Sequence, residues 1–213
     1  MLSGLPRVRL AGGTLWRVFQ RHRDNPWFFA AVDELRPHLS GRFALPAPYG
    51  ACSLATSKTA AILEAFQEYS DGVIPLSALR RRMVARIWAP ASAPAAVQLT
   101  AARARGVGVT AALWAGGDRV CTQQWALTLH RAGWRALYGG VARDPAGRLR
   151  AVTLFDRSGE HVPYDDVAWQ ATIEPADSPD VRAALGGYGI RVTRTDPDLP
   201  FIELDASGLK GQP

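Results

Sequence analysis

The stretch ACSLATSKTAAILEAFQEY, residues 51–69, decides the fold class, because its pattern changes from strand to helix within a few residues. Residues 51–55 have the composition of a short strand. From Ser57 onward the apolar side chains recur at helical spacing, and Ser57 itself is a suitable N-cap. We therefore predict a strand at 51–55 and a helix at 57–69, which Asp71-Gly72 ends.

Outside this unit, short strands outnumber helices. A turn at 46–50 joins the strand at 51–55 to another, and Gly133 is placed to stop a helix that Thr122 caps. Several short strands with only two good helices favour an α+β fold over a doubly wound sheet. We predict further strands at 14–19, 41–45, 84–89, 97–100, 135–138, 149–155 and 190–195, and further helices at 122–131 and 179–185.

Length and composition predict one compact globular domain over residues 1–213. Apolar residues make up 47% of the 213 and charged residues 21%, which excludes a disordered chain. Cys52 and Cys121 are too few for a disulfide framework or a four-cysteine zinc site, and the four histidines are scattered. Neither a signal peptide nor an apolar run of the ~18 residues that a membrane helix needs is visible. We expect a cytoplasmic protein without a metal.

The net charge of +6 comes almost entirely from arginine, since Lys58 and Lys210 are the two lysines. Codon usage in a GC-rich genome explains this composition as well as an anionic ligand does. A nucleic-acid partner is disfavoured, because aromatic side chains other than Trp88 are missing between the clustered arginines. These arginines are Arg80, Arg81, Arg82, Arg86, Arg103 and Arg105.

Three residues stand out once the familiar motifs are excluded. The sequence has no Gly-x-Gly-x-x-Gly, Walker loop, His-Glu-x-x-His or Gly-x-Ser-x-Gly. Arg17 lies in the middle of an apolar strand, Arg42 lies in a loop rich in glycine and proline, and Glu64 is a carboxylate flanked by apolar residues on a helix. Each also has an ordinary explanation as a solvated side chain on a strand, turn or helix surface.

The order of these pieces resembles the RES domain family, the toxin components of bacterial toxin–antitoxin pairs. The strand arginine comes first, then the Gly41-Arg42-Phe43 loop, then Cys52-Ser53-Leu54-Ala55 and the helix glutamate. The resemblance spans about residues 14–157 and leaves 158–213 as a C-terminal extension. It continues in residues 122–126, 133–138, 144–149 and 154–155.

The resemblance implies a fold related to ADP-ribosyltransferases and cleavage of the nicotinamide–ribose bond of NAD⁺ by water or phosphate. It implies Glu64, Arg17 and Arg42 as catalytic residues, with Arg17, Arg42, Tyr49 and Ser53 binding NAD⁺. Ser53 stands where the family has a tyrosine, for which Tyr49 is a nearby substitute. A family serine is expected near Gly140, where this chain has none.

The resemblance also implies a protein antitoxin of the Xre type as partner. The arginine clusters would then form either an antitoxin-binding face or a solvated one. Whether the chain forms a homo-oligomer stays open. Two alternatives to NAD⁺ cleavage remain: an ADP-ribosyltransferase that modifies a macromolecule, and an inactive binding module of the same fold.

The chemistry explains why these residue types are needed. Nicotinamide leaves as a neutral molecule, so the barrier lies in the positive charge that develops on the ribose. A carboxylate such as Glu64 stabilises that charge, and arginines bind the pyrophosphate or an attacking phosphate. Tyr49, Trp27 and Phe43 are the aromatic residues that we expect to stack on a base.

Overall fold

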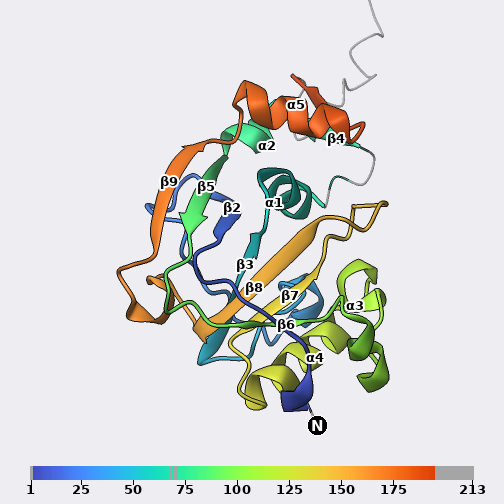
Figure 1. Cartoon of the computed structure of the whole chain (residues 1–213). Coiled ribbons are helices and arrows are strands. Elements are labelled where there is room, and N and C mark those ends of the chain that lie inside the picture. Colours follow the sequence, from blue (N-terminus) through green and yellow to red (C-terminus); the bar gives the residue numbers. More distant parts are fainter. Residues whose placement is uncertain (1, 68, 70–71, 195–213) are drawn as a thin grey trace, which may run out of the picture.

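The computed structural model describes residues 2–67, 69 and 72–194 of the chain. This part of the chain has the predicted α+β class, with one large mixed sheet and a few short helices (Figure 1). Eight of its strands form the large sheet in the order β1-β6-β7-β8-β3-β2-β5-β9, and β10 pairs in parallel with β4. The strands are β1 (Arg7–Val8), β2 (Thr14–Gln20), β3 (Tyr49–Ala55), β4 (Val73–Pro75), β5 (Arg82–Trp88), β6 (Ala96–Gln98), β7 (Ala136–Gly140), β8 (Arg150–Arg157), β9 (Gln170–Pro175) and β10 (Arg191–Thr193).

The helices form two groups. Figure 1 shows α1, α2 and α5 together at one end of the molecule, and α3 and α4 together at the other. None of the helices in the described ranges is long and apolar enough to cross a membrane. The α-helices are α1 (Lys58–Ala65), α2 (Leu76–Arg80), α3 (Ala112–Ala115), α4 (Arg119–Arg131) and α5 (Pro179–Gly187), and the 3-10 helices are η1 (Leu2–Gly4), η2 (Pro37–Leu39), η3 (Ala102–Val107) and η4 (Pro163–Asp165).

Side-chain alternation along β3 shows how the two helix groups share one face of the sheet. Ala55 belongs to the apolar core under α1, which we call the α1 core, together with Ile62, Leu63 and Phe66. Ala51 packs against the core under α4, which includes Leu129, Leu137 and Phe155 and which we call the α4 core. Alternate residues of a strand point to the same face, so Ser53 faces the space between the two cores.

The opposite face of the sheet buries a third apolar cluster, which we call the back core. Leu15 and Phe19 of β2 contribute to it together with Cys52 and Leu54 of β3. Loop residues cover this core, including Trp27, Phe29 and Trp169. The α1 and α4 cores and the back core thus sandwich the sheet, and Ser53 lies where the helix layer is interrupted.

Several predicted elements are confirmed. Strands 14–19, 51–55, 84–89, 135–138 and 149–155 correspond to β2, β3, β5, β7 and β8, and helix 179–185 corresponds to α5. The predicted strands 97–100 and 190–195 are shorter than expected, as β6 and β10, and residue 195 lies outside the described residues. Gly133 follows the end of α4 with a φ of +90°, the left-handed conformation that glycine favours.

Other predictions were wrong in their bounds. Residues 41–45 do not form a strand: the amide of Ala44 donates to the Gly41 carbonyl in a turn, and only Leu45 makes a strand bridge. The helix capped by Ser57 ends at Ala65 rather than at 69, and the predicted stop at Asp71 lies outside the described residues.

The helix predicted at 122–131 begins three residues earlier, because Asp118 caps it. The Asp118 carboxylate accepts from the Cys121 amide at 2.8 Å. Thr122 was the predicted cap, but it lies inside the helix, where its hydroxyl bonds to the carbonyls of Arg42 and Arg119. Asp118 is an equally good cap by residue type, so tertiary contacts decided between the two.

The segment after residue 158 is part of the main sheet. Strand β9 pairs with β5 along its length, from Met83↔Pro175 to Trp88↔Gln170. Helix α5 adds Val181 and Leu185 to the α1 core. The described part of the predicted C-terminal extension therefore completes the fold, while residues 195–213 lie outside the described residues.

We predict that position 50 must be glycine, because another backbone segment approaches it closely. A Cβ at position 50 would lie 2.5 Å from the Phe29 carbonyl oxygen, whereas one at Gly139 meets nothing within 4 Å. Gly50→Ala should cost about 1–3 kcal/mol in the free energy of unfolding. Gly139→Ala should leave the thermal midpoint unchanged or slightly raised, because alanine loses less entropy on folding. Equal midpoints for the two variants in a calorimetric scan would contradict this packing.

Candidate functional site

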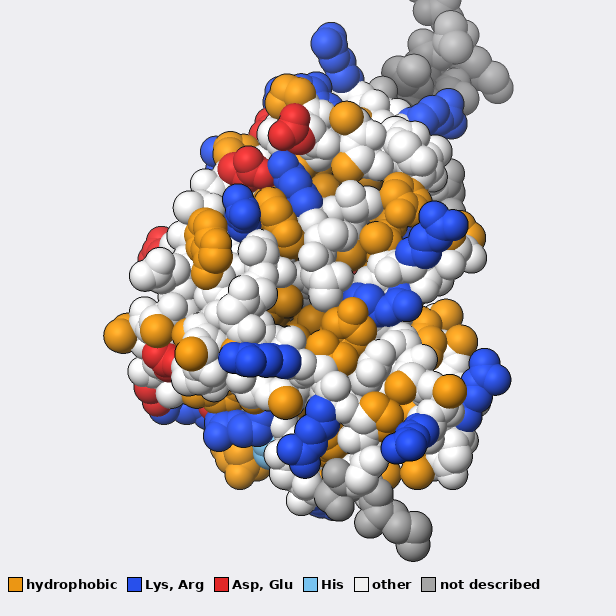
Figure 2. All heavy atoms as spheres, viewed as in Figure 1, with side chains coloured by type: hydrophobic (Ala, Val, Ile, Leu, Met, Phe, Trp, Pro, Cys, Tyr) orange, Lys and Arg blue, Asp and Glu red, His pale blue; other side chains and the backbone are white. Residues whose placement is uncertain are grey.

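A cleft lies between the two helix groups, with Ser53 and Glu64 at its centre. The larger of its two cavities has a volume of about 250 Å³ and is bordered by Arg42, Arg119 and Gly140. A smaller cavity of about 100 Å³ adjoins it and extends along β2. Both cavities are lined by Ser53, Leu54, Glu64 and Gln67. Figure 2 shows this face of the molecule, on which basic side chains are spread widely while acidic ones gather toward β9 and α5.

Glu64 is a partly buried carboxylate, and a hydrogen bond and two positive charges compensate for its lost solvation. It lies in the last turn of α1, and its Oε1 accepts a hydrogen bond from the amide of Ala142 at 3.1 Å. Burial raises the pKa of Glu64, while the Ala142 amide and the positive charges of Arg42 and Arg119 act in the opposite direction. The carboxylate is therefore positioned at the cleft wall by both α1 and the backbone after β7.

Arg42 is the second charged group of the cleft. One of its terminal nitrogens, Nη1, donates to the carbonyl of Gly116. The pKa of Arg42 is lowered by burial and by the neighbouring charge of Arg119, and Glu64 acts in the opposite direction. Two guanidinium groups thus lie near a single carboxylate, which leaves an excess of positive charge at the cleft.

Helix α4 holds the loop that carries Arg42. Thr122 and Gln123 are both buried polar residues. The Thr122 hydroxyl lies 2.5 Å from the carbonyl oxygen of Arg42, and Gln123 Nε2 donates to the carbonyls of Pro37 (2.8 Å) and Gly41 (3.2 Å). The sequence predicts a strand at 41–45, whose carbonyls would bond to a neighbouring strand. Instead, side chains of α4 donate to the carbonyls of this segment, which forms a turn.

Arg119 is a cleft residue that the sequence analysis missed. It occupies the first position of α4, where a positive charge is disfavoured by the helix dipole. That unfavourable placement was the available signal, but many surface arginines share it. Arg119 is recognisable only when the fold brings it next to Arg42 and Glu64.

Arg17 borders the smaller cavity, but its guanidinium group is directed to the back core. It donates to the sulfur of Cys52 and to the carbonyl of Phe28 at 3.1 Å. This direction follows from alternation, since Arg17 lies on the same side of β2 as Leu15 and Phe19. The structure therefore brings Arg42, Ser53 and Glu64 together at the cleft, and turns the charge of Arg17 away from them.

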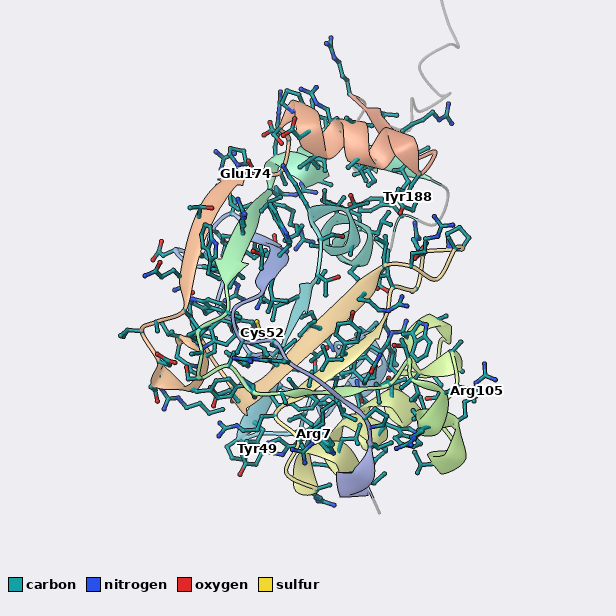
Figure 3. All side chains as sticks on the ribbon, viewed as in Figure 1. Arg7, Tyr49, Cys52, Arg105, Glu174 and Tyr188 are labelled. Carbon is teal, nitrogen blue, oxygen red and sulfur yellow. The ribbon has the colours of Figure 1, made fainter. Side chains whose placement is uncertain are left out.

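Tyr49 lies outside the cleft. Its ring packs 4.5 Å from the ring of His130, and it borders a separate cavity with Arg135 and Phe155. Figure 3 shows Tyr49 and Arg105 on opposite sides of the α4 half of the molecule. Of the other aromatic candidates, Trp27 is buried in the back core, and Phe43 lines the larger cavity.

Trp114 is an aromatic residue of the cleft that the sequence analysis did not identify. It projects from the short helix α3 and packs directly on Gly140: a Cβ added to Gly140 would lie 2.7 Å from Trp114 Cδ1. The glycine at the position expected for the family serine thus provides the space that the indole ring occupies. No periodicity marks Trp114 in the sequence, because α3 has only four residues.

No group of three or more His, Cys, Asp or Glu side chains that could hold a metal ion occurs within residues 2–67, 69 and 72–194. Among the described residues, the titratable side chains that border the larger cavity are one carboxylate and two guanidinium groups. Two guanidinium groups beside one carboxylate leave a net positive charge, which favours an anionic ligand.

Comparison with known proteins finds one similar fold. No family model and no curated protein matches this sequence. A chain in the crystal structure of the M. tuberculosis MbcT–MbcA toxin–antitoxin complex has a similar fold, with a TM-score of 0.56 and 21% sequence identity. The match covers 80% of this chain and 89% of that chain, so the shared fold includes most of both.

The hydrogen bonds of Gln123 are predicted to support the Arg42 loop. Gln123→Ala removes its hydrogen bonds to the carbonyls of Pro37 and Gly41, each worth about 0.5–1.5 kcal/mol in unfolding free energy, while both carbonyls keep a bond from a backbone amide. Gln124→Ala removes an exposed neighbour on the same helix and should be close to neutral. Denaturant unfolding of both variants measures the difference, and a similar small effect for both would contradict the proposed support.

Proposed function

We propose that this chain is a toxin-like enzyme of the RES type that cleaves the nicotinamide–ribose bond of NAD⁺. The observation that carries the proposal is the cleft in which the partly buried carboxylate of Glu64 lies with the guanidinium groups of Arg42 and Arg119. The fold shared with a toxin–antitoxin complex and the ordered sequence resemblance support it. The proposal treats residues 1–213 as one RES-like domain with a fold related to ADP-ribosyltransferases.

Glu64 acts on the ribose. As the bond to nicotinamide breaks, positive charge develops on the ribose, and a desolvated carboxylate nearby stabilises it more strongly than a solvated one does. The hydrogen bond from Ala142 to Oε1 fixes the carboxylate and leaves its other oxygen for the substrate or for an attacking water. Nicotinamide leaves as a neutral molecule, so the site does not need a general acid.

Arg42 and Arg119 bind the phosphate groups. Both arginines border the cavity that also contains Glu64 and Ser53. Guanidinium groups form strong paired hydrogen bonds with phosphate oxygens, and a bound phosphate would neutralise the excess positive charge of the pair. The same two groups are suited to hold an attacking inorganic phosphate, in which case the products are nicotinamide and a phosphorylated ADP-ribose.

In this proposal Arg17 and Tyr49 do not contact the reacting bond. Arg17 positions the wall of the smaller cavity, because it links β2 to Cys52 on β3 and to the loop carbonyl of Phe28. Ser53 contacts the substrate directly, since it lines both cavities. We further propose a cytoplasmic protein that a protein antitoxin inhibits.

Glu64→Gln should abolish the loss of NAD⁺ without unfolding the protein. Removal of one preorganised charge typically lowers a rate by about 10²–10³-fold. The amide side chain of the variant would retain an oxygen that can accept from the Ala142 amide. The control is Glu160→Gln, which removes a partly exposed carboxylate bonded to Asn25 and Arg23.

The measurement follows labelled NAD⁺ with purified wild type and both variants. Wild-type turnover by Glu64→Gln would refute the role of Glu64. Label attached to a macromolecule rather than to free ADP-ribose or its phosphate would indicate the transferase alternative. Absence of any turnover by the wild type, with or without phosphate and a cell extract, would favour the inactive binding module.

The activity should decline on acidification at a higher pH than an ordinary glutamate (pKa about 4.3) would produce. Burial raises the pKa of Glu64, so its reactive ionised form is lost at a higher pH. The folded state then binds this proton more tightly than the unfolded state, so ionisation of Glu64 lowers stability as pH rises through the raised pKa. Rates and thermal midpoints of wild type and Glu64→Gln across about pH 4–8 test both parts; identical pH dependences of stability would contradict the second.

A further inference from the structure

The cavity that contains Glu64 is small for a dinucleotide. Its volume is about 250 Å³, whereas pockets for small molecules usually have about 300–1,000 Å³. The adjoining cavity along β2 adds about 100 Å³. NAD⁺ consists of two nucleotides, so a site for the whole molecule requires further space.

A second pocket provides this space on the other side of Trp114. It has a volume of about 270 Å³ and is bordered by Trp114 and Gly140, the residues that also border the Glu64 cavity. The two pockets therefore meet at the contact between the indole ring and the glycine. Together they reach the size range of a small-molecule site.

The walls of this second pocket suit a nucleotide. Thr100 and Thr110 contribute hydroxyl groups, and Arg105 lines the pocket as an exposed side chain. Among the described residues, the guanidinium group of Arg105 has no hydrogen bond or ion pair. Arg150 contributes a guanidinium group, one nitrogen of which donates to the carbonyls of Gly147 and Leu149. Apolar surface comes from Leu99, Val109 and Trp114.

The pocket also contains one carboxylate, that of Asp144, which is already engaged. It accepts hydrogen bonds from the backbone amides of Ala146 (3.1 Å) and Leu149 (2.5 Å). These bonds hold the turn between β7 and β8. The arginines at the pocket therefore remain the groups that determine its preference for an anion.

We propose that the pocket lined by Thr100, Arg105, Thr110 and Arg150 binds the adenylate half of NAD⁺, with Trp114 as a stacking surface between the two halves. The inference rests on the proposed function. Arginine binds the phosphate, the threonine hydroxyls face the ribose and base, and the apolar wall covers the adenine ring. Substrates that lack the adenylate half would use only the Glu64 cavity.

Two alanines of the α3 region provide a matched test. Ala111 and Ala115 are both exposed, but only Ala111 lines the second pocket. Ala111→Phe should fill the pocket and raise KM for NAD⁺ at least about tenfold with kcat retained, whereas Ala115→Phe should behave as wild type. The affinity for nicotinamide mononucleotide, measured as its inhibition of NAD⁺ cleavage, should be the same in all three proteins.

A second pair of variants tests the charge without adding bulk. Arg103 and Arg105 are exposed arginines of the same 3-10 helix, and only Arg105 lines the pocket. Arg105→Ala should raise KM for NAD⁺ about 10- to 100-fold, as expected for the loss of one charge-assisted contact. Arg103→Ala has the same net charge and should leave KM unchanged.

The outcomes separate this inference from the proposed function. If the wild type leaves NAD⁺ intact, the proposed function fails and the adenylate pocket fails with it. If the wild type cleaves NAD⁺ and both Ala111→Phe and Arg105→Ala retain the wild-type KM, only the adenylate pocket fails. An equal loss of affinity for nicotinamide mononucleotide and NAD⁺ would also overturn it, because the effect would then lie in the Glu64 cavity.

Discussion

The placement of the Glu64 carboxylate is the constraint on which the site depends. Removing a carboxylate from water is costly unless hydrogen bonds and opposite charges compensate for the loss of solvation. Here the amide of Ala142 and the charges of Arg42 and Arg119 provide that compensation. Each comes from a different segment, so a functional cleft requires α1, the loop before β3, α4 and the end of β7 to be correctly placed together.

The sheet makes this convergence possible. It presents one face to two separate helix groups, and β3 crosses the gap between them. Ser53 is consequently exposed in the middle of a strand whose neighbours Cys52 and Leu54 are buried. The buried polar residues Thr122 and Gln123 then anchor the Arg42 loop at the far wall, so the cleft is bordered by regular elements and by one tightly bonded turn.

The sequence predicted the elements that local pattern determines. The run of strand-forming apolar residues at 14–19 and the Ser57 cap with helical spacing are local signals, and both the strand and the start of the helix are confirmed. The turn at residues 41–45 was mistaken for a strand because its backbone is satisfied by Gln123, which is 82 residues away from Gly41 in the chain. Strand β9 was missed because its alternation rests on two apolar residues alone, Ala171 and Ile173, and its pairing with β5 decides its conformation.

The candidate site was predictable only in part. Arg42, Ser53 and Glu64 came from the ordered resemblance, and the structure brings these three residues to one cleft. Arg119 and Trp114 could not be recognised, since their significance depends on tertiary contact with Arg42 and Gly140. Arg17 is the opposite case, because its unusual position in an apolar strand was visible in the sequence. The face to which its charge points was not visible, since the register of β2 sets it.

The most direct test of the central claim is proton NMR of NAD⁺ incubated with the purified wild-type protein, in matched buffers with and without inorganic phosphate. The account predicts that the resonances of the intact dinucleotide are replaced by those of free nicotinamide, and a requirement for phosphate would identify the nucleophile. A spectrum of unchanged NAD⁺ in both buffers, from protein that is folded and monodisperse, would contradict the account.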